Sequence, residues 1–354
     1  MRGSAAFRVA VAPGGALAGP WVRNSLWTAA RAVPSLDLRF ADNKSLVDAV
    51  TGQQLVTHTR ASSGTFVGSD GVLQTATTNE PRFDHNPTTG ESLGLLVEEA
   101  RTNLLLNSGT LSTQSVTVTA VAHTLHFTGT GTITLTGAST AGPLVGTGAG
   151  EANRVSLTFT PTAGSLTLTV SGTVTNAQLE AGAFRTSYIS TTGATATRAA
   201  DVASITGSAF SSWYRQDEGA FFGEVLPAPT YVAFQAVASL QAATNADEWR
   251  LWRTGTTTQS SIVNLSNTTE LSAAVTFVTT SNGSYKFATA AAANNMAIAS
   301  SGNLVSDNIG AMVPFTSIRI GARGNGAFVH NGTIKRLTFW PTRLANSTLQ
   351  SITQ

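Results

Sequence analysis

The stretch from Thr102 to Gly150 contains no Asp, Glu, Lys or Arg, and this feature most constrains what the chain can fold into. Within and beyond this stretch, short runs alternate threonine or serine with aliphatic or aromatic side chains. These runs are residues 115–120, 124–127, 132–136, 155–159 and 166–170. Successive side chains of a β-strand point to opposite faces, so the alternation predicts strands with one apolar and one hydroxyl face. We therefore expect residues 106–200 to form a compact, jelly-roll-like β-sandwich.

Composition narrows the classes of function. Only 11% of the 354 residues are charged, the formal net charge is +2, and cysteine is absent. Nucleic-acid binding needs clustered cations, while disulfides and thiolate metal sites need cysteine, so we expect none of these. No apolar run approaches the roughly 18 residues that cross a bilayer, so we expect no membrane insertion.

Residues 36–105 are predicted to form a β-hairpin and connecting segment that packs on the next domain. Alternation of apolar with polar residues begins at Leu36 and reaches Phe40. Farther on, Ser69-Asp70-Gly71 separates two apolar runs, and Asp and Gly tolerate the positive φ angle that a tight hairpin turn requires.

A second sandwich is predicted for residues 201–354. Nine alternating runs follow Asp201, which favours two packed antiparallel sheets. Helical spacing is confined to the C-terminus, where Leu349 and Ile352 are three residues apart and Asn346 or Ser347 is the candidate N-cap. The predicted fold class is therefore all-β, with tandem antiparallel β-sandwiches after an extended N-terminal arm.

Residues 1–35 form that arm. They are rich in Gly, Ala and Pro but also carry Trp21 and Trp27, an unusual combination for a flexible linker. In one interpretation the arm packs on its own domain. In the other it is an anchor whose two tryptophans dock on another protein of an assembly, because a disordered segment can fold on binding.

Four segments, in this order and spacing, together resemble a family of bacteriophage virion proteins of the tail-fibre, head-fibre or spike type. They are Thr59-Arg60-Ala61-Ser62 with Thr65-Phe66-Val67; Asn79-Glu80-Pro81-Arg82-Phe83-Asp84-His85 with residues 94–105; Asn176-Ala177-Gln178-Leu179-Glu180 with residues 184–189; and residues 195–201. The resemblance implies a virion-surface protein, commonly a homotrimer, that contacts host-cell glycans.

The C-terminal part resembles the concanavalin A-like, laminin G-type sandwich in which such proteins often end. The segments that carry this resemblance are residues 317–321, 332–341 and Arg343-Leu344. The resemblance therefore implies a lectin-like C-terminal domain, a fold that is also found in glucanases.

We predict no catalytic, metal or cofactor site. The paired acids Glu98-Glu99, Asp217-Glu218 and Asp247-Glu248 are each consecutive, so on a strand the two carboxylates of a pair would point to opposite faces. His123 and His126 are three residues apart, which also separates them on a strand and disfavours zinc. Carboxylates that meet across strands remain an alternative.

Binding residues leave little sequence trace, so the candidates are exposed aromatic and polar groups. In residues 247–253, alternation should send Trp249 and Leu251 to one face and Arg250 and Trp252 to the other. Such a tryptophan beside an arginine can contact a glycan or a neighbouring subunit. The full set of candidate contacts is Trp213, Tyr214, Arg250, Trp252, Asn325 and His330, with a surface role as the default for His330.

The sequence thus predicts a phage-type virion structural protein, a fibre, spike or decoration subunit that displays lectin-like domains for attachment to host glycans. Its expected location is the virion surface, and its expected partners are other virion proteins bound through the arm, copies of itself in a trimer, and host glycans. A polysaccharide depolymerase of lectin-like fold is the alternative.

Overall fold

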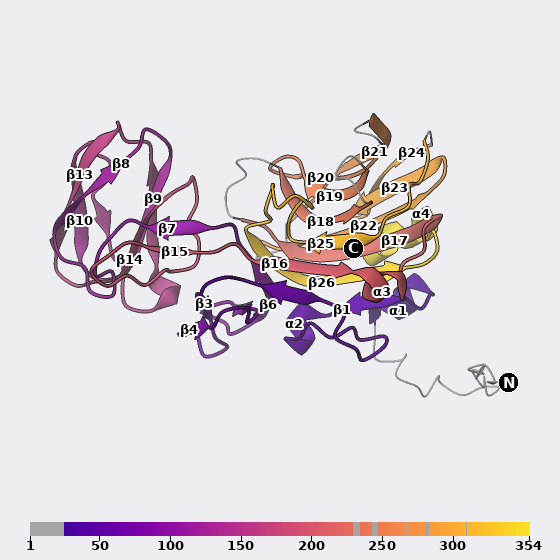
Figure 1. The fold of residues 1–354 in the computed structure, drawn as a ribbon, viewed down its shortest axis with the longest axis horizontal. Helices are drawn as coiled ribbons and strands as arrows, with labels where there is room; N and C mark the ends of the chain where they lie inside the picture. Colours follow the sequence, from indigo (N-terminus) through magenta and orange to yellow (C-terminus); the bar gives the residue numbers. More distant parts are fainter. Residues whose placement is uncertain (1–24, 229–233, 243–246, 266–267, 280–282, 309) are drawn as a thin grey trace.

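The computed structural model describes residues 25–228, 234–242, 247–265, 268–279, 283–308 and 310–354. The chain is all-β, built from antiparallel sheets that form two sandwiches side by side along the long axis, which confirms the predicted fold class (Figure 1). No helix in the described ranges is long and apolar enough to cross a membrane.

The smaller, middle sandwich contains seven strands. They are β8 (Gln114–Val118), β9 (His123–Gly129), β10 (Thr132–Gly137), β11 (Leu144–Val145), β12 (Val155–Phe159), β13 (Gly164–Ser171) and β14 (Val174–Ala181). One sheet has the order β11-β10-β13-β8 and the other β12-β9-β14. The alternating residues Leu166 and Leu168 of β13 are fully buried beside Leu125 and Phe127 of β9. Each such buried side chain contributes roughly 1.5–3 kcal/mol, so the predicted apolar face forms the core.

The larger sandwich contains an eight-stranded and a seven-stranded sheet. The first consists of β1 (Leu36–Leu38), β5 (Phe83–His85), β6 (Ser92–Val97), β17 (Glu218–Leu226), β22 (Tyr285–Ala292), β23 (Asn295–Ser300), β24 (Asn303–Asp307) and β26 (Gly332–Trp340). The second consists of β2 (Thr57–Thr59), β16 (Val202–Thr206), β18 (Gln235–Gln241), β19 (Glu248–Arg253), β20 (Thr258–Leu265), β21 (Thr268–Thr276) and β25 (Ser317–Ile320). Their orders are β24-β23-β22-β17-β26-β6-β5, with β1 also on β26, and β2-β16-β25-β18-β19-β20-β21.

Segment 36–105 differs from the prediction that it packs on the following domain, because its strands complete the larger sandwich. β1 and β6 pair with β26, and β2 pairs with β16. The reason is that β1 and β6 bury side chains on both faces, so both faces need packing partners, and the larger sandwich supplies them. The middle sandwich is thus inserted between two parts of the larger one.

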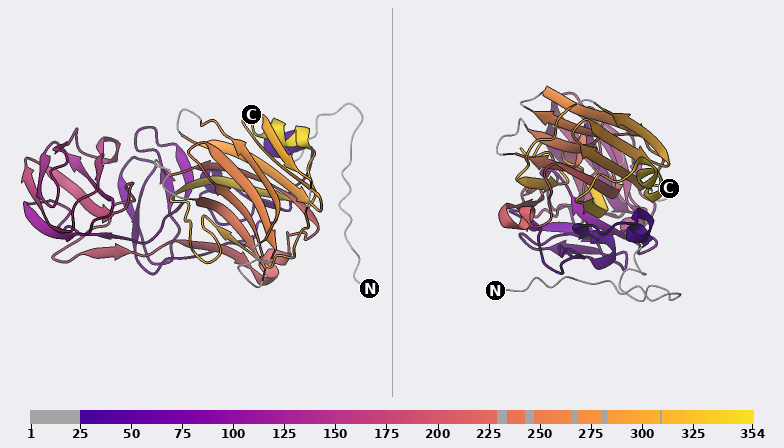
Figure 2. Two further views of the ribbon diagram at one scale, coloured as in Figure 1. Left: turned by 90° about the horizontal axis from the view of Figure 1, so that it is seen from above. Right: turned by 90° about the vertical axis from the view of Figure 1, so that its right-hand side faces the viewer.

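Two short antiparallel pairs complete the junction between the sandwiches. β7 (Arg101–Asn103) and β15 (Ala196–Arg198) pair where the chain leaves and re-enters the larger sandwich. The predicted hairpin is confirmed as β3 (Gly64–Val67) and β4 (Leu73–Ala76), with Gly71 at a φ of 75° in the turn. The left view of Figure 2 shows this N-terminal segment between the two sandwiches.

Asn103 and Asn107 tie the start of the inserted sandwich to its end. The Asn103 amide donates to the carbonyl oxygens of Ala177 and Ile189, at 3.0 and 2.8 Å, and its oxygen accepts the backbone N–H of Leu105. Asn107 accepts the N–H of Gly193. The two side-chain amides therefore hold together the segment that enters the middle sandwich and the segment that leaves it.

The helices are short and lie at the edges. They are α1 (Ser25–Ala30), α2 (Phe40–Asn43), the 3-10 turn η2 (Glu151–Asn153), α3 (Gly207–Ser211) and α4 (Asn346–Ile352). In α4, Leu349 and Ile352 are buried as predicted. The predicted N-cap is wrong, because Ala345 occupies that position and no side chain caps the helix.

The described part of the arm packs on its own chain. Leu26 and Ala30 of α1 join a core cluster with Trp340 and Leu349. The indole Nε1 of Trp27 donates to Asp37 Oδ2 at 2.9 Å. This corrects the prediction that Trp27 anchors the chain to a particle, because the indole N–H is already hydrogen-bonded within the larger sandwich. Trp21 lies outside the described residues.

Candidate functional site

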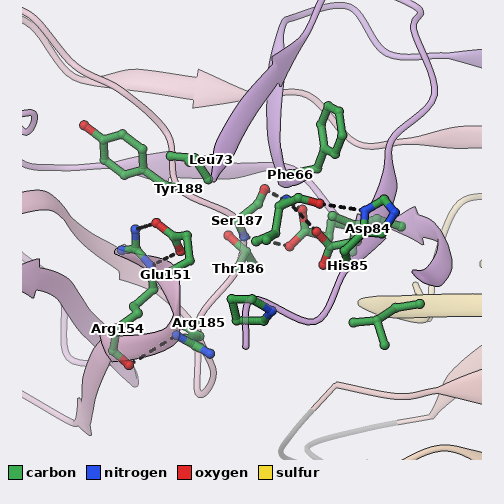
Figure 3. Close-up of a pocket in the computed structure, with 15 residues that line it drawn as sticks. Phe66, Leu73, Asp84, His85, Glu151, Arg154, Arg185, Thr186, Ser187 and Tyr188 are labelled. Atoms are coloured by element: carbon green, nitrogen blue, oxygen red, sulfur yellow. Dashed lines mark hydrogen bonds and ion pairs between the residues drawn. The ribbon is translucent and has the colours of Figure 1, made fainter. Parts of the chain in front are cut away.

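A cavity of about 220 Å³ lies at the junction of the two sandwiches (Figure 3). One wall comes from the hairpin and strands β5 and β6, and the other from η2 and the segment after β14. Its lining residues are Phe66, Val67, Leu73, Asp84, His85, Pro87, Leu93, Leu96, Glu98, Glu151, Arg154, Arg185, Thr186, Ser187 and Tyr188. Figure 3 shows Glu151, Arg154 and Arg185 on one side and Asp84 and His85 on the other.

A buried ion network forms the floor beside this cavity. Asp201 accepts from Arg60 Nη1 at 3.0 Å and from Arg82 Nη2 at 2.5 Å, and Arg82 Nη1 lies 2.8 Å from Glu98 Oε2. Burial alone would raise the pKa of the Asp201 carboxyl, but the positive charge of Arg82 and the close approach of His58 Nε2, 3.4 Å from Oδ1, hold it below its ordinary value. These contacts hold the hairpin segment against the point where the chain re-enters the larger sandwich.

Asp84 is a carboxyl group of the cavity wall whose pKa is shifted toward neutral pH. Its Oδ1 accepts the backbone N–H of Val67 at 2.7 Å, which fixes the carboxyl against the hairpin. Burial raises the pKa of Asp84 to about 6, against the lowering effect of that hydrogen bond. The carboxyl therefore changes its charge close to neutral pH, inside a cavity that also holds cationic groups.

Arg154 is held in place by a dense set of contacts. Its Nε and Nη2 donate to the two carboxylate oxygens of Glu151, at 2.6 and 2.5 Å, and its Nη1 donates to the carbonyl of Asn176 at 2.9 Å. The guanidinium also lies 5.7 Å from the centre of the Tyr188 ring. A bidentate, stacked arginine is well ordered, so it presents a fixed positive charge to the cavity.

Arg185 lies beside Arg154 and forms far fewer hydrogen bonds. Its hydrogen bond among the described residues runs from Nη1 to the carbonyl of Arg154, at 3.5 Å, and no described carboxylate forms an ion pair with it. Partial burial and the nearby charge of Arg154 lower the pKa of its guanidinium. Arg185 thus retains donor groups for a ligand at the exposed side of the cavity.

This combination of groups determines what the cavity can bind. Phe66, Leu73 and Tyr188 supply apolar surface, Arg185 supplies free charged donors, and Asp84 supplies an acceptor. Cavities that bind small polar ligands combine an apolar lining with a few convergent polar groups. The arrangement therefore suits a polyhydroxylated ligand that carries a carboxylate.

Two of the predicted contact residues, Trp213 and His330, are buried, and a third, Tyr214, is partly buried against the core, which corrects their assignment. Trp213 is 3% exposed and packs edge-on against Phe210 and Phe339 in the main core. Tyr214 contacts the same two rings. His330 is fully buried, and burial lowers the pKa of its imidazole to about 4. Trp213 and Tyr214 follow α3 and turn inward because large aromatic side chains fill the space between the sheets.

Arg250 and Trp252 do lie together on β19, opposite the buried Trp249 and Leu251, as the alternation predicts. Trp252 is nevertheless only 6% exposed. The Phe234 ring stacks on it with centroids 4.6 Å apart, and the Arg250 guanidinium lies 4.6 Å from its centre. The exposed aromatic of this face is therefore Phe234, at 41%, and not the tryptophan.

Asn325 lies in the exposed loop before β26, where its side-chain oxygen accepts the N–H of Ala327 at 3.0 Å. This bond closes a local turn. The loop also carries Phe328, whose ring lies 5.9 Å from that of Trp252. The loop of Asn325 thus reaches Trp252 through Phe328, while Trp213 and His330 belong to the interior and Tyr214 is partly buried.

The sequence prediction did not assign the cavity residues to a site. Asp84 and Arg185 both lie in segments that carry the family resemblance, but 101 positions separate them (185 − 84), and no local periodicity joins them. The available signal was charge, because Glu151, Arg154 and Arg185 interrupt a region that is otherwise nearly uncharged. Across the described ranges, no three His, Asp or Glu side chains gather in a group that could hold a metal ion.

The fold and the cavity define a two-sandwich, all-β protein with a polar cavity at the junction of its sandwiches. No family model matches the sequence, and no curated protein matches it. Among solved structures, the Ruminococcus gnavus IT-sialidase CBM40 bound to α2,3-sialyllactose is similar with a TM-score of 0.34 and 14% identity, over 39% of this chain and 83% of that one.

Two other similar structures cover comparable parts of the chain. The NanB sialidase of Streptococcus pneumoniae gives a TM-score of 0.36 at 9% identity, over 42% of this chain and 26% of that one. The binding domain of botulinum neurotoxin DC gives 0.33 at 12% identity, over 44% and 40%. TM-scores this low do not allow the ligands of those proteins to be transferred to this chain.

Proposed function

We propose that this chain is a structural protein of a bacteriophage-type virion surface, a fibre, spike or decoration subunit, that attaches to host glycans through its junction cavity. The observation that carries the binding role is the unpaired guanidinium of Arg185 in a cavity lined by aromatic, hydroxyl and carboxyl groups. The favoured ligand is an acidic saccharide, because its carboxylate pairs with Arg185 while its ring packs against Phe66 or Tyr188.

A panel of acidic and neutral oligosaccharides tests the binding role. The wild-type protein should bind those that carry a carboxylate, and Arg185→Gln should weaken this binding at least about 10-fold, the usual value of one charge-assisted hydrogen bond. Arg215→Gln is the matched control, since Arg215 is exposed and bonded to Asp217 away from the cavity. A flat response of the wild type across the panel would overturn the proposal.

The virion location rests on the resemblance of four segments to phage virion proteins, and the trimer rests on the same resemblance. Mass spectrometry of purified particles from a culture that produces this chain tests the location, and the native mass of the isolated protein tests the trimer. The anchor role now concerns the residues before α1. Deletion of residues 1–24, which keeps α1 and Trp27, should abolish incorporation, and incorporation of the truncated chain would exclude that anchor.

A depolymerase remains the second candidate, because Asp84 and Glu151 place two carboxyl groups on the same cavity and burial raises the pKa of Asp84 to about 6. A raised carboxyl pKa is what a general acid needs near neutral pH. Glu151, however, has both oxygens bonded to Arg154, which disfavours it as a nucleophile or base. Release of reducing ends from host polysaccharide by the wild type, and its loss in Asp84→Asn, would establish this candidate over simple attachment.

A further inference from the structure

Arg198 is a buried guanidinium that has no hydrogen bond. Its exposed fraction is 1%, and Nε, Nη1 and Nη2 all lack an acceptor in the described part of the chain. The nearest carboxylate oxygens are Oε2 of Glu98, 3.5 Å from Nη2, and Oδ2 of Asp201, 4.0 Å from Nη1. These contacts are ion pairs without hydrogen-bond geometry, so all the donors of Arg198 are open.

The two neighbouring arginines form hydrogen bonds within the same network. Arg60 donates from Nε to the carbonyl of Ser62, from Nη1 to Asp201 and from Nη2 to the carbonyl of Thr77. Arg82 donates through both terminal nitrogens, to Asp201 and to the carbonyl of Thr65. Arg82 Nε has no acceptor, but both arginines keep their terminal nitrogens hydrogen-bonded, and Arg198 does not.

The three arginines of this network do not share its carboxylates equally. Three arginines, Arg60, Arg82 and Arg198, lie against the carboxylates of Glu98 and Asp201. Arg60 and Arg82 form hydrogen bonds with Asp201, whereas Arg198 forms none with either carboxylate. The carboxylates raise the pKa of Arg82, whereas burial and the charge of Arg82 leave the pKa of Arg198 below its ordinary value. A buried charge is stable when it is paired and hydrogen-bonded, so the open donors of Arg198 call for an acceptor such as an anion.

Arg198 lines a second cavity, of about 130 Å³, which is separate from the junction cavity although Tyr188 borders both. Its other walls carry small hydroxyl side chains, among them Ser62, Thr75, Ser190 and Thr197. A water molecule occupies about 30 Å³ of liquid, so the space is large enough for an ion of several heavy atoms. Hydroxyl groups can donate to the anion oxygens that Arg198 does not reach.

We propose that this second cavity is a binding site for a small oxyanion, a carboxylate, sulfate or phosphate group, held by Arg198 and the surrounding hydroxyls. The planar guanidinium matches two oxygens of such an anion. The site goes beyond the glycan-attachment function and does not depend on it, because it uses a different cavity and a different arginine. An anion bound here links the hairpin, the segment 188–190 and β15, and so stabilises the junction between the sandwiches.

Thermal unfolding in the presence of acetate, sulfate or phosphate, each at constant ionic strength made up with sodium chloride, tests the site. At least one of the three should raise the melting temperature of the wild type by about 3 °C or more and saturate in the millimolar range. Arg198→Gln should remove the response. The three anions distinguish a planar carboxylate from a tetrahedral ion as the preferred ligand.

A second pair of variants covers the case in which Arg198→Gln does not fold. Ser190 is exposed and lines the same cavity. Ser190→Glu should supply the missing carboxylate from within the chain, so it should be more stable than the wild type without added anion and insensitive to all three. Ser190→Gln, of the same size, should respond as the wild type does. A wild type that melts at the same temperature in all three anions, or a Ser190→Glu variant that still responds fully, would show that water fills the cavity and overturn the proposal.

Discussion

The Nη2 atom of Arg82 lies 2.5 Å from Oδ2 of Asp201, 119 positions later in the chain, and both side chains are fully buried. The whole middle sandwich is inserted between these two residues. The ion pair therefore joins the two ends of the insertion, and the cavity beside it depends on this closure. Its contribution to stability is the first property to test.

Asp201→Asn should lower the free energy of unfolding by about 3–5 kcal/mol, because it leaves Arg60 and Arg82 with an uncompensated buried charge. Urea denaturation measures the loss. Asp217→Asn is the control, since that carboxylate is exposed and its removal should change stability little. Equal stability of Asp201→Asn and the wild type would contradict the structural role.

Asp201 also predicts acid lability. The folded pKa lies below the unfolded value of about 3.9, so the group stabilises the fold above pH 4, and this stabilisation is lost as the pH falls below 4. The acid-unfolding curve of Asp201→Asn should lack this contribution. A curve parallel to that of the wild type below pH 4 would count against it.

His330 predicts a loss of stability as the pH falls below about 6.5. Its folded pKa of about 4 lies below the unfolded value of about 6.5, so between these values only the unfolded state takes up the proton. Stability should therefore fall as the pH drops from 6.5 to 4, by up to roughly 3 kcal/mol from this group. Replacement by Phe should flatten the profile in this window while leaving the loss below pH 4. An unchanged profile would show that the imidazole is not buried as described.

The periodicity of the sequence predicts much of the fold, because a strand with one buried face shows alternating apolar and polar residues in its own sequence. Leu166 and Leu168 of β13 face the core as expected, and the Asp70-Gly71 turn closes its hairpin. β1 differs, since Asp37 between two leucines is itself buried. Its charge is balanced by Arg336, 299 positions away, and such a partner has no local signature.

The candidate site could not be predicted for the same reason. The cavity brings together residues of the hairpin segment and residues of the middle sandwich, and the interruption of one sandwich by the other decides which of them meet. Aromatic side chains also mislead, because Trp213 and Trp252 have the composition of a binding surface but are covered by other rings. The exposed Phe234 becomes distinguishable only once the stacking order is known.

Because of Asp84, the free energy of unfolding should decrease as the pH rises from about 4 to 6. Its folded pKa of about 6 lies above the unfolded value of about 3.9, so the folded state binds the proton more tightly and stability falls as the pH rises through this range. Asp84→Asn should remove the dependence and raise stability at pH 8 by about 1–2 kcal/mol, less than the full shift implies because the side chain is partly exposed. Glu80→Gln, on the nearby exposed loop, should leave the dependence intact.

Among the rings of Trp252, Phe234 and Phe328, that of Trp252 should contribute most to stability and that of Phe234 little. Trp252→Ala should cost about 3–5 kcal/mol of unfolding free energy, because it opens a cavity beneath two rings. Phe234→Ala removes a ring that is 41% exposed and should cost less than about 1 kcal/mol. Similar costs for the two variants in urea denaturation would contradict the stacking order.

The most direct test of the account compares an acidic oligosaccharide with its carboxyl-reduced form, in which the carboxylate is replaced by a hydroxymethyl group. Titration calorimetry should give a dissociation constant about 10-fold or more lower for the acidic form with the wild-type protein. Arg185→Gln should remove that preference and leave the affinity for the reduced form unchanged. Equal affinity of the wild type for both forms, or a preference that persists in Arg185→Gln, would contradict the assignment of the junction cavity as the glycan site.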